Sequence, residues 1–183
     1  MARIYLVRHG EASGYDGADP ALTDLGQRQA QIVAERLDQI TGSPIEIVCS
    51  PLRRARDTAQ PLADRWAKTA LVVDAVRELP SPGTQQERRP WLRTALRSTF
   101  ADLGDEQRAW RNSILQAVTS FEHDTAVFTH AVVISAVVGH VQHDDRVLGF
   151  LPANTSITVI DVLDGEVTLV ERGEGRDDVG EVG

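Results

Sequence analysis

The chain has 183 residues, of which 42% are hydrophobic and 25% are charged, and its formal net charge is −8. These values are typical of one soluble globular domain and argue against disorder of the whole chain. The negative charge argues against broad binding to nucleic acid or anionic membranes, and a single cysteine, Cys49, excludes an intrachain disulfide and a cysteine-rich zinc site.

Strands alternate with helices along the chain, which predicts an α/β domain with a largely parallel sheet. Short apolar runs predict strands at 3–7, 45–49, 70–74, 125–129, 156–161 and 166–171. Helical periodicity and end signals predict helices at 24–40, 52–67, 90–101, 106–121 and 131–141. For the first helix, Thr23 is the expected N-cap and Gly42 the expected stop.

We expect one domain over residues 1–172, interrupted by a small helical insertion at about 79–123 that begins in a run rich in proline and glycine. Residues 173–183 combine glycine with charged residues and are expected to form a loose tail. The start of the chain shows no signal-peptide pattern, and no stretch approaches 18 apolar residues, so we expect a cytoplasmic protein.

The first predicted strand is followed directly by Arg8-His9-Gly10 and then by Glu11. Ligand sites in open α/β sheets gather at the carboxyl ends of strands. Arg8 offers a fork of donors that suits phosphate or carboxylate oxygens, and Gly10 allows a sharp turn or the close approach of a ligand. This tripeptide predicts an anion held beside an imidazole nucleophile.

A second polar cluster, Ser50 to Ala59, also follows a strand and opens a helix. Helix N-termini attract anions, so arginines in the first turn are unfavourable unless they meet a negative group. Arg53, Arg54 and Arg56 all lie here, and at least one of them is expected to point inward rather than into solvent.

Two further positions complete the candidate set. His130 follows the predicted strand 125–129 and begins an apolar helix, while Glu78 follows the predicted strand 70–74. Taken singly, such a histidine is more often structural and such a glutamate more often solvated, so the prediction depends on all of these positions occurring together.

Together these segments resemble the histidine phosphatase superfamily, the phosphoglycerate-mutase-like proteins, from Arg3 to about Glu171. The Arg-His-Gly-Glu motif stands at residues 8–11, the motif Ser-Pro-Leu-x-Arg-Ala-x-x-Thr-Ala at residues 50–59, and the late strand-end histidine at His130. The family's Leu-Arg-Glu form stands at residues 76–78, with Val76 in first place. The resemblance implies a three-layer α/β/α sandwich with a mostly parallel sheet and a small helical insertion over the site.

The resemblance also implies a role for each residue. His9 would be the nucleophile that forms a phosphohistidine, and Glu78 the general acid and base. Arg8, Arg54 and a protonated His130 would hold the phosphoryl oxygens. No metal and no cofactor is expected. The expected activity is hydrolysis of a phosphomonoester, by a phosphoric monoester hydrolase.

Two departures from the family pattern argue against a phosphoglycerate-type mutase. Tyr15 stands where mutases and several small-molecule phosphatases have an asparagine, and the segment between Glu78 and His130 is shortened. Two further hypotheses stay open: a phosphohistidine protein phosphatase, and a non-catalytic module that binds a phosphorylated ligand.

The expected partner is a phosphorylated small molecule or a phosphoprotein, and the sequence does not decide between them. No nucleic-acid or membrane partner is expected, and the oligomeric state stays open. Arg89, Arg93 and Arg97 recur every four residues, which predicts one ridge on a helix, either a solvated face or a basic lip that recruits an anionic substrate. Glu11 is expected to be structural.

Overall fold

The computed structural model describes residues 1–13, 19–81 and 83–177. Its elements, in chain order, are β1 (Ala2–Arg8), α1 (Asp24–Thr41), β2 (Glu46–Cys49), α2 (Arg53–Trp66), β3 (Leu71–Val72), η1 (Asp74–Val76), α3 (Gln85–Ala95), η2 (Phe100–Asp102), α4 (Asp105–Thr119), β4 (Thr125–Thr129), α5 (Ala131–Gln142), β5 (Leu151–Pro152), β6 (Ile157–Leu163), β7 (Glu166–Glu171) and β8 (Gly175–Arg176).

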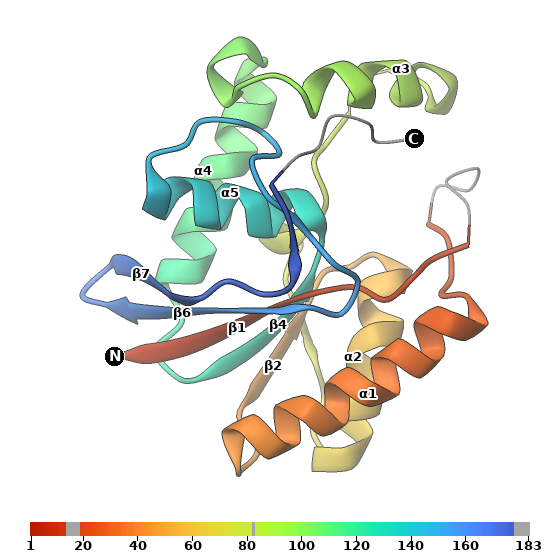
Figure 1. The fold of residues 1–183 in the computed structure, drawn as a ribbon, viewed down its shortest axis with the longest axis vertical. Helices are drawn as coiled ribbons and strands as arrows, with labels where there is room; N and C mark the ends of the chain where they lie inside the picture. Colours follow the sequence, from red (N-terminus) through yellow and green to blue (C-terminus); the bar gives the residue numbers. More distant parts are fainter. Residues whose placement is uncertain (14–18, 82, 178–183) are drawn as a thin grey trace.

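Six strands form one sheet in the order β3-β2-β4-β1-β6-β7. The pairs β2/β3, β2/β4 and β1/β4 are parallel, whereas β1/β6 and β6/β7 are antiparallel. Helices α1 and α2 cover one face of the sheet, and α4 and α5 cover the other with α3 beyond them (Figure 1). The sheet is therefore mixed but mostly parallel, and the expected α/β sandwich is confirmed.

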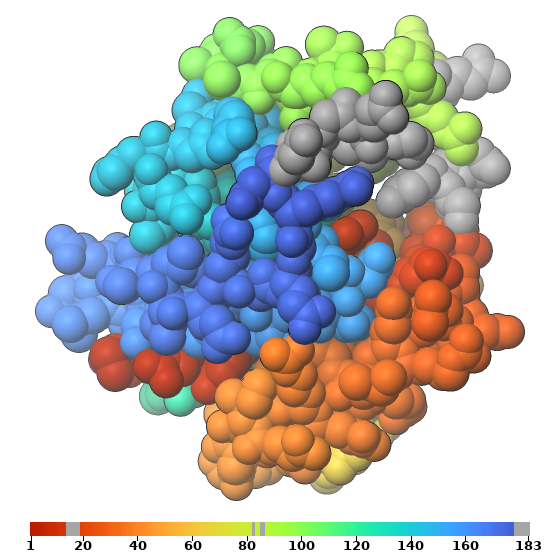
Figure 2. Space-filling model, in the orientation of Figure 1, coloured from red at the N-terminus to blue at the C-terminus, as the bar shows by residue number. Residues whose placement is uncertain are grey.

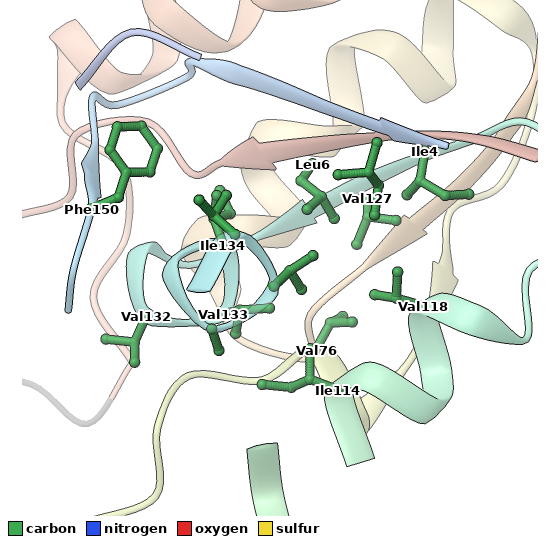
Figure 3. Packing of buried hydrophobic residues seen from close by; sticks show 14 of the residues in the cluster. Ile4, Leu6, Val76, Ile114, Val118, Val127, Val132, Val133, Ile134 and Phe150 are labelled. Carbon is green, nitrogen blue, oxygen red and sulfur yellow. The ribbon is translucent and has the colours of Figure 1, made fainter. Parts of the chain in front are cut away.

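Side chains of β1 alternate between two hydrophobic cores, one on each face of the sheet. Ile4 and Leu6 pack with Ile134 of α5 (Figure 3), whereas Tyr5 and Val7 belong to the cluster beneath α1 and α2. Because successive strand residues point to opposite faces, a strand buried on both faces must be apolar throughout. This burial explains the continuous apolar run that begins the chain and ends at the Arg8-His9 motif.

The predicted element boundaries differ from the structure in the middle of the chain. Helix α3 begins at Gln85, not at residue 90, because a capping box of Thr84 and Glu87 starts it and Pro90 lies inside it. The strand predicted at 70–74 is only Leu71–Val72, and the 3-10 turn η1 begins at Asp74, the last residue of the predicted strand. The helices predicted at 90–101 and 106–121 correspond to α3, the short η2 and α4.

The chain after β7 also differs from the sequence-based expectation. A loose tail is expected from residue 173, yet Gly175–Arg176 form strand β8, which pairs antiparallel with β5. Residues 178–183 of that expected tail lie outside the described residues. Within the described part of the chain, no helix combines the length and apolar character needed to cross a membrane.

Candidate active site

The candidate site lies where three neighbouring parallel strands end at the same edge of the sheet. β1 ends at Arg8 and is followed by His9, β4 is followed by His130, and β2 is followed by Ser50. Arg8 is paired with Thr129 in the β1/β4 register, so the two histidines leave the sheet side by side. Their ring centroids are 5.3 Å apart, with 61° between the ring planes.

Hydrogen bonds to both ring nitrogens orient the imidazole of His9. Nδ1 lies 2.7 Å from the carbonyl oxygen of Gly10, and Nε2 lies 3.1 Å from Nε of Arg54. A carbonyl oxygen only accepts and a guanidinium nitrogen only donates, so we assign the proton to Nδ1 and the lone pair to Nε2. Burial, reinforced by the charges of Arg54 and Arg8, lowers the pKa of His9 to about 3. The ring is therefore neutral and nucleophilic at neutral pH.

Gly10 is needed because helix α1 approaches it closely. A Cβ atom at Gly10 would lie 2.6 Å from the carbonyl oxygen of Gly26, and one at Gly26 would lie 2.0 Å from the carbonyl oxygen of Glu11. The amide of Gly10 donates to Oγ1 of Thr58, whose hydroxyl donates to the carbonyl of Arg54. A packing contact between segments thus explains this glycine.

Arg54 is the arginine of the second cluster that points inward. Its residue exposure is 4%, whereas Arg53 is exposed and pairs with Asp57 at 3.3 Å. The carboxylate of Asp19 accepts the backbone N–H of Arg53 at 2.8 and 2.9 Å, at the N-terminus of α2, and lies 4.0 Å from Arg54 Nη1. The inward position agrees with the sequence-based assignment of Arg54 to the anion pocket.

Arg8 supplies a second positive charge. Its Nη1 donates to the carbonyl oxygen of Pro152 at 2.6 Å, which anchors one edge of the guanidinium. The charges of Arg54 and Arg8 both lower the pKa of His9 and of His130, so both cations act on the same pair of rings. Two guanidinium groups around one nucleophile form a site suited to a phosphoryl group.

His130 is completely buried and is held by Ser50. Its Nε2 lies 2.7 Å from Oγ of Ser50, which also accepts the N–H of Leu52 at 3.2 Å. We assign the Ser50 hydroxyl as the donor to Nε2 of His130, so the proton of the neutral ring lies on Nδ1. Among the described residues Nδ1 has no hydrogen-bond partner, and it lies 3.8 Å from Oε2 of Glu78.

A protonated His130 is expected from the sequence, and the electrostatics of the site change that expectation. Burial first, and then the charge of Arg54, lower the pKa of His130 well below its ordinary value. Protonation would therefore require a phosphoryl dianion, whose negative charge would raise the pKa. Even as a neutral ring, His130 can donate one hydrogen bond from Nδ1.

Glu78 lies beside His130 and has the properties of a proton donor. Burial raises the pKa of its carboxyl group, while Arg54, the N–H of Leu79, Arg8 and Arg88 act in the opposite direction. Oε1 accepts that N–H at 3.0 Å, and 17% of the side chain stays exposed. A carboxyl group with a raised pKa that remains accessible keeps its acid form to higher pH than an ordinary glutamate does, which suits a general acid.

Several polar residues singled out from the sequence lie outside this constellation. Glu11 is exposed, and its carboxylate accepts the hydroxyl of Thr23, the residue that caps α1. Tyr15 lies outside the described residues. Arg89, Arg93 and Arg97 are exposed on α3 and just beyond it, and the half-buried Arg88 is the α3 cation whose charge lowers the pKa of Glu78 and of His130.

Two contributions to the site could not be predicted from the sequence. Ser50 belongs to a recognised motif, but its contact with His130 spans 80 residues and no local pattern predicts it. Asn154 donates from Nδ2 to the carbonyl oxygen of His9 at 2.9 Å, across 145 residues. The only local signal for Asn154 is a turn-forming Pro-Ala-Asn-Thr-Ser run before β6, which predicts a turn and not a contact with the site.

Comparison with known proteins gives a family and a fold. The family model of the histidine phosphatase superfamily (branch 1) matches residues 4–174. "Probable phosphoglycerate mutase GpmB" from Proteus mirabilis is 33% identical over 121 residues, which cover 63% of this chain and 50% of that protein. The protein of the same name from Yersinia pestis (strain Pestoides F) is 39% identical over 87 residues, 43% of this chain and 39% of that one. The chain thus spans half or less of the length of these curated relatives.

Solved structures share the fold along almost the whole chain. Phosphoserine phosphatase from Entamoeba histolytica, in complex with 3-phosphoglyceric acid, superposes with a TM-score of 0.71 at 22% identity, covering 95% of this chain and 98% of that chain. YhfR of Bacillus stearothermophilus superposes with a TM-score of 0.77 at 19% identity, with the same coverage of both chains. A mycobacterial glucosyl-3-phosphoglycerate phosphatase gives a TM-score of 0.70 at 24% identity, covering 93% of this chain and 98% of that chain.

Proposed function

The chain belongs to the histidine phosphatase superfamily (branch 1), and from this membership we propose that it hydrolyses a phosphomonoester through a phosphohistidine on His9. The observation that carries the proposal is the state of the His9 ring. Its Nδ1 is engaged by the Gly10 carbonyl, and its unprotonated Nε2 is held against Arg54. The nucleophilic nitrogen and the cation that would neutralise an incoming phosphoryl group are therefore adjacent.

In the first step, Nε2 of His9 attacks phosphorus while the bond from phosphorus to the ester oxygen breaks. Arg8 and Arg54 bind the phosphoryl oxygens, and His130 donates to them from Nδ1. Glu78 gives its proton to the leaving oxygen, so an alcohol departs and the carboxylate remains. A carboxyl group that keeps its proton to higher pH than an ordinary glutamate is suited to this role, which agrees with the raised pKa of Glu78.

In the second step, water attacks the phosphohistidine and the P–N bond breaks, returning the electron pair to Nε2. The Glu78 carboxylate takes one proton from the attacking water, which restores its acid form. Inorganic phosphate leaves, and the enzyme regains its starting protonation state. Each step draws only on side chains of this chain, so we expect a chelator to leave the activity unchanged.

The proposed substrate class is a small phosphorylated molecule. The named activities of the fold neighbours, on phosphoserine and on glucosyl-3-phosphoglycerate, support this class. Mutase activity is the second candidate, because curated relatives carry a mutase name. Incubation with 3-phosphoglycerate separates the two: hydrolysis releases inorganic phosphate, whereas a mutase interconverts isomers without net release.

Turnover of a generic aryl phosphate, compared between the wild type, His9→Ala and His123→Ala, tests the proposal. His123 is exposed and serves as the matched control. We expect His9→Ala to abolish turnover and His123→Ala to retain it, and we expect acid-labile phosphate to map to His9. Undiminished turnover in His9→Ala would refute the proposal.

A phosphohistidine protein phosphatase would release imidazole, a leaving group that needs less help from an acid than an alkoxide does. Glu78→Gln is therefore the discriminating variant. We expect it to lose most activity on phosphomonoesters. If Glu78→Gln hydrolyses phosphoramidates at the wild-type rate but no longer hydrolyses phosphomonoesters, the result would favour a phosphohistidine protein phosphatase.

A further inference from the structure

The segment of residues 152–156, which runs from the last residue of β5 to the start of β6, holds Arg8 at the end of β1 and His9 directly after it. We call it the clamp loop. It contacts Arg8 and His9 through four hydrogen bonds: Arg8 Nη1 to the carbonyl of Pro152, the N–H of Thr155 to the carbonyl of Arg8, the N–H of Arg8 to the carbonyl of Ser156, and Nδ2 of Asn154 to the carbonyl of His9. Both the pocket arginine and the nucleophile are therefore attached to one short turn.

The clamp loop keeps an uncommon backbone conformation. Thr155 has φ of +56°, in the left-handed region that β-branched residues rarely adopt. Its hydroxyl donates to the carbonyl of Asn154, and the N–H of Ser156 donates to the carbonyl of Ala153. Such a conformation persists only where its surroundings hold it, so the loop depends on its contacts on both sides.

The segment after β7, residues 172–177, supports the clamp loop from the opposite side. We call it the brace. Gly175 pairs with Pro152, and the N–H of Ala153 donates to the carbonyl of Glu174 at 2.8 Å. A Cβ atom at Gly175 would lie 2.5 Å from both the carbonyl oxygen of Leu151 and the Phe150 ring. Figure 2 shows the dark blue end of the described chain lying directly against the sky-blue segment near residue 150.

We propose that Asn154 is a positioning residue for His9 and that the brace keeps the clamp loop in place for it; the inference rests on the proposed function. The carbonyl that Asn154 binds belongs to the peptide joining His9 to Gly10. The carbonyl of Gly10 in turn binds Nδ1 of His9. Asn154 therefore holds the backbone of His9 and the start of Gly10, the residue whose carbonyl orients the imidazole.

The contacts predict different kinetic effects for the loss of Asn154 and for a disturbance of the brace. The side-chain amide of Asn154 donates to His9 and the loop anchors Arg8 through Pro152 instead, so loss of the amide should misalign His9 while the two arginines still bind phosphate. The brace supports Pro152 as well, whose carbonyl anchors Arg8. Its disturbance should therefore weaken substrate binding in addition to slowing the chemical step.

Asn154→Ala and Asn154→Leu test the first part, with Asn112→Ala, an exposed asparagine of α4, as the control. Leucine keeps the side-chain volume and removes the amide. We expect both Asn154 variants to lower kcat on an aryl phosphate by about 10- to 100-fold with KM within about threefold of the wild type. A wild-type kcat in both variants, or an equal loss in Asn112→Ala, would overturn the proposal.

Gly175→Val tests the brace, with Val170→Thr on the exposed face of β7 as the control. We expect Gly175→Val to raise KM and lower kcat together while the thermal midpoint shows the protein still folded. If Gly175→Val changes neither constant, the brace has no part in positioning. If the variant does not fold, Glu174→Pro, which alters the same segment without adding a side chain against Phe150, replaces it.

A readout independent of turnover separates this inference from the proposed function. In protein labelled with ¹⁵N-histidine, His9 of the wild type should give one Nδ1-protonated and one unprotonated Nε2 signal. We expect Asn154→Leu to shift or broaden these signals and Asn112→Ala to leave them unchanged. Inactivity of the wild type on every phosphoester would defeat the proposed function, whereas unchanged His9 signals in Asn154→Leu would defeat the positioning role.

Discussion

His9 and His130 are held neutral beside two arginines, and keeping them neutral lowers the stability of the folded chain in acid. The folded chain keeps His9 uncharged, with a pKa of about 3, whereas an unfolded histidine takes up a proton near 6.5. Burial lowers the pKa of His130 in the same direction. Between these values the unfolded chain binds more protons than the folded chain, so acid favours unfolding.

The free energy of unfolding should therefore fall as the pH drops from about 6.5 toward 3, with a limiting slope of about 1.4 kcal/mol per pH unit for each such histidine. The raised pKa of Glu78 has the opposite effect above pH 4.5. There the folded chain keeps a proton on Glu78 that the unfolded chain has lost, so this residue makes the free energy of unfolding rise as the pH drops. Urea unfolding at pH 7, 6, 5 and 4 measures the slope. His9→Asn should show a smaller slope than the wild type, and equal slopes would contradict the prediction.

Ser50 is expected to affect catalysis because its hydroxyl donates to Nε2 of His130 and so keeps the ring proton on Nδ1. Removing its hydroxyl leaves the buried Nε2 without its partner and allows the ring proton to move there. We predict that Ser50→Ala lowers kcat by about 10- to 100-fold and costs about 1–3 kcal/mol in stability. Steady-state kinetics and urea unfolding check both effects, and Ser120→Ala, a remote serine whose hydroxyl bonds to Ala117, is the control.

Residue motifs predict much of the candidate site because the family motifs fall at strand ends. His9, Arg54, His130 and Glu78 are indeed brought together at one edge of the sheet. Asn154 could not be predicted, since its partner lies 145 residues away and the contact depends on the path of the loop. The neutral state of His130 also required the structure, because it follows from burial.

At the scale of elements, the close contact between α1 and the loop after β1 sets where the nucleophile lies. A glycine-to-alanine change in a helix normally stabilises it by about 0.5–1 kcal/mol. Gly26→Ala should do the opposite, because the new Cβ would meet the Glu11 carbonyl at 2.0 Å. We predict a stability loss of about 1–3 kcal/mol and reduced kcat, measured against the exposed α1 control Gln31→Ala. A stabilised variant would contradict this packing argument.

Helix α3 influences the proton donor through Arg88. Its positive charge lowers the pKa of Glu78, opposing the effect of burial. Arg88→Gln should therefore raise that pKa, keep the acid form to higher pH and move the alkaline limb of the kcat profile upward. The pH–rate profile tests this shift, with the exposed Arg93→Gln as control. A downward shift, or the same shift in both variants, would contradict the role of Arg88.

Long elements were predictable from periodicity and end signals, and short ones were not. Helix α1 follows its predicted range closely, with Thr23 as N-cap and Gly42 as stop. Helix α3 starts earlier than predicted because the capping box of Thr84 and Glu87 begins the helix at Gln85, which leaves Pro90 inside the helix and not at its start. Strands β5 and β8 have two residues each, too few for an alternating pattern, so pairing between distant segments creates them.

At the scale of the molecule, both hydrophobic cores share one sheet, so they should melt together. Trp66 is the last residue of α2 and packs in the cluster on one face of the sheet, whereas Trp91 and Trp110 pack on the opposite face, within the predicted insertion. We predict that tryptophan fluorescence and far-UV circular dichroism give one coincident unfolding transition. In Trp66→Phe, the remaining tryptophan fluorescence comes from Trp91 and Trp110, which lie in the predicted insertion. A separate transition there would show that residues 79–123 unfold as an independent unit.

The central place of β1 in the sheet also has a consequence for synthesis on the ribosome. The strand that leads to the nucleophile is made before its neighbours β4 and β6, and Ile4 pairs with Thr125 and Ile160. Pairings that are so distant in sequence form slowly, because a long loop must close before they are gained. The nascent chain must therefore carry an unpaired apolar strand until β4 and β6 have been made, and the nucleophile takes its position only then.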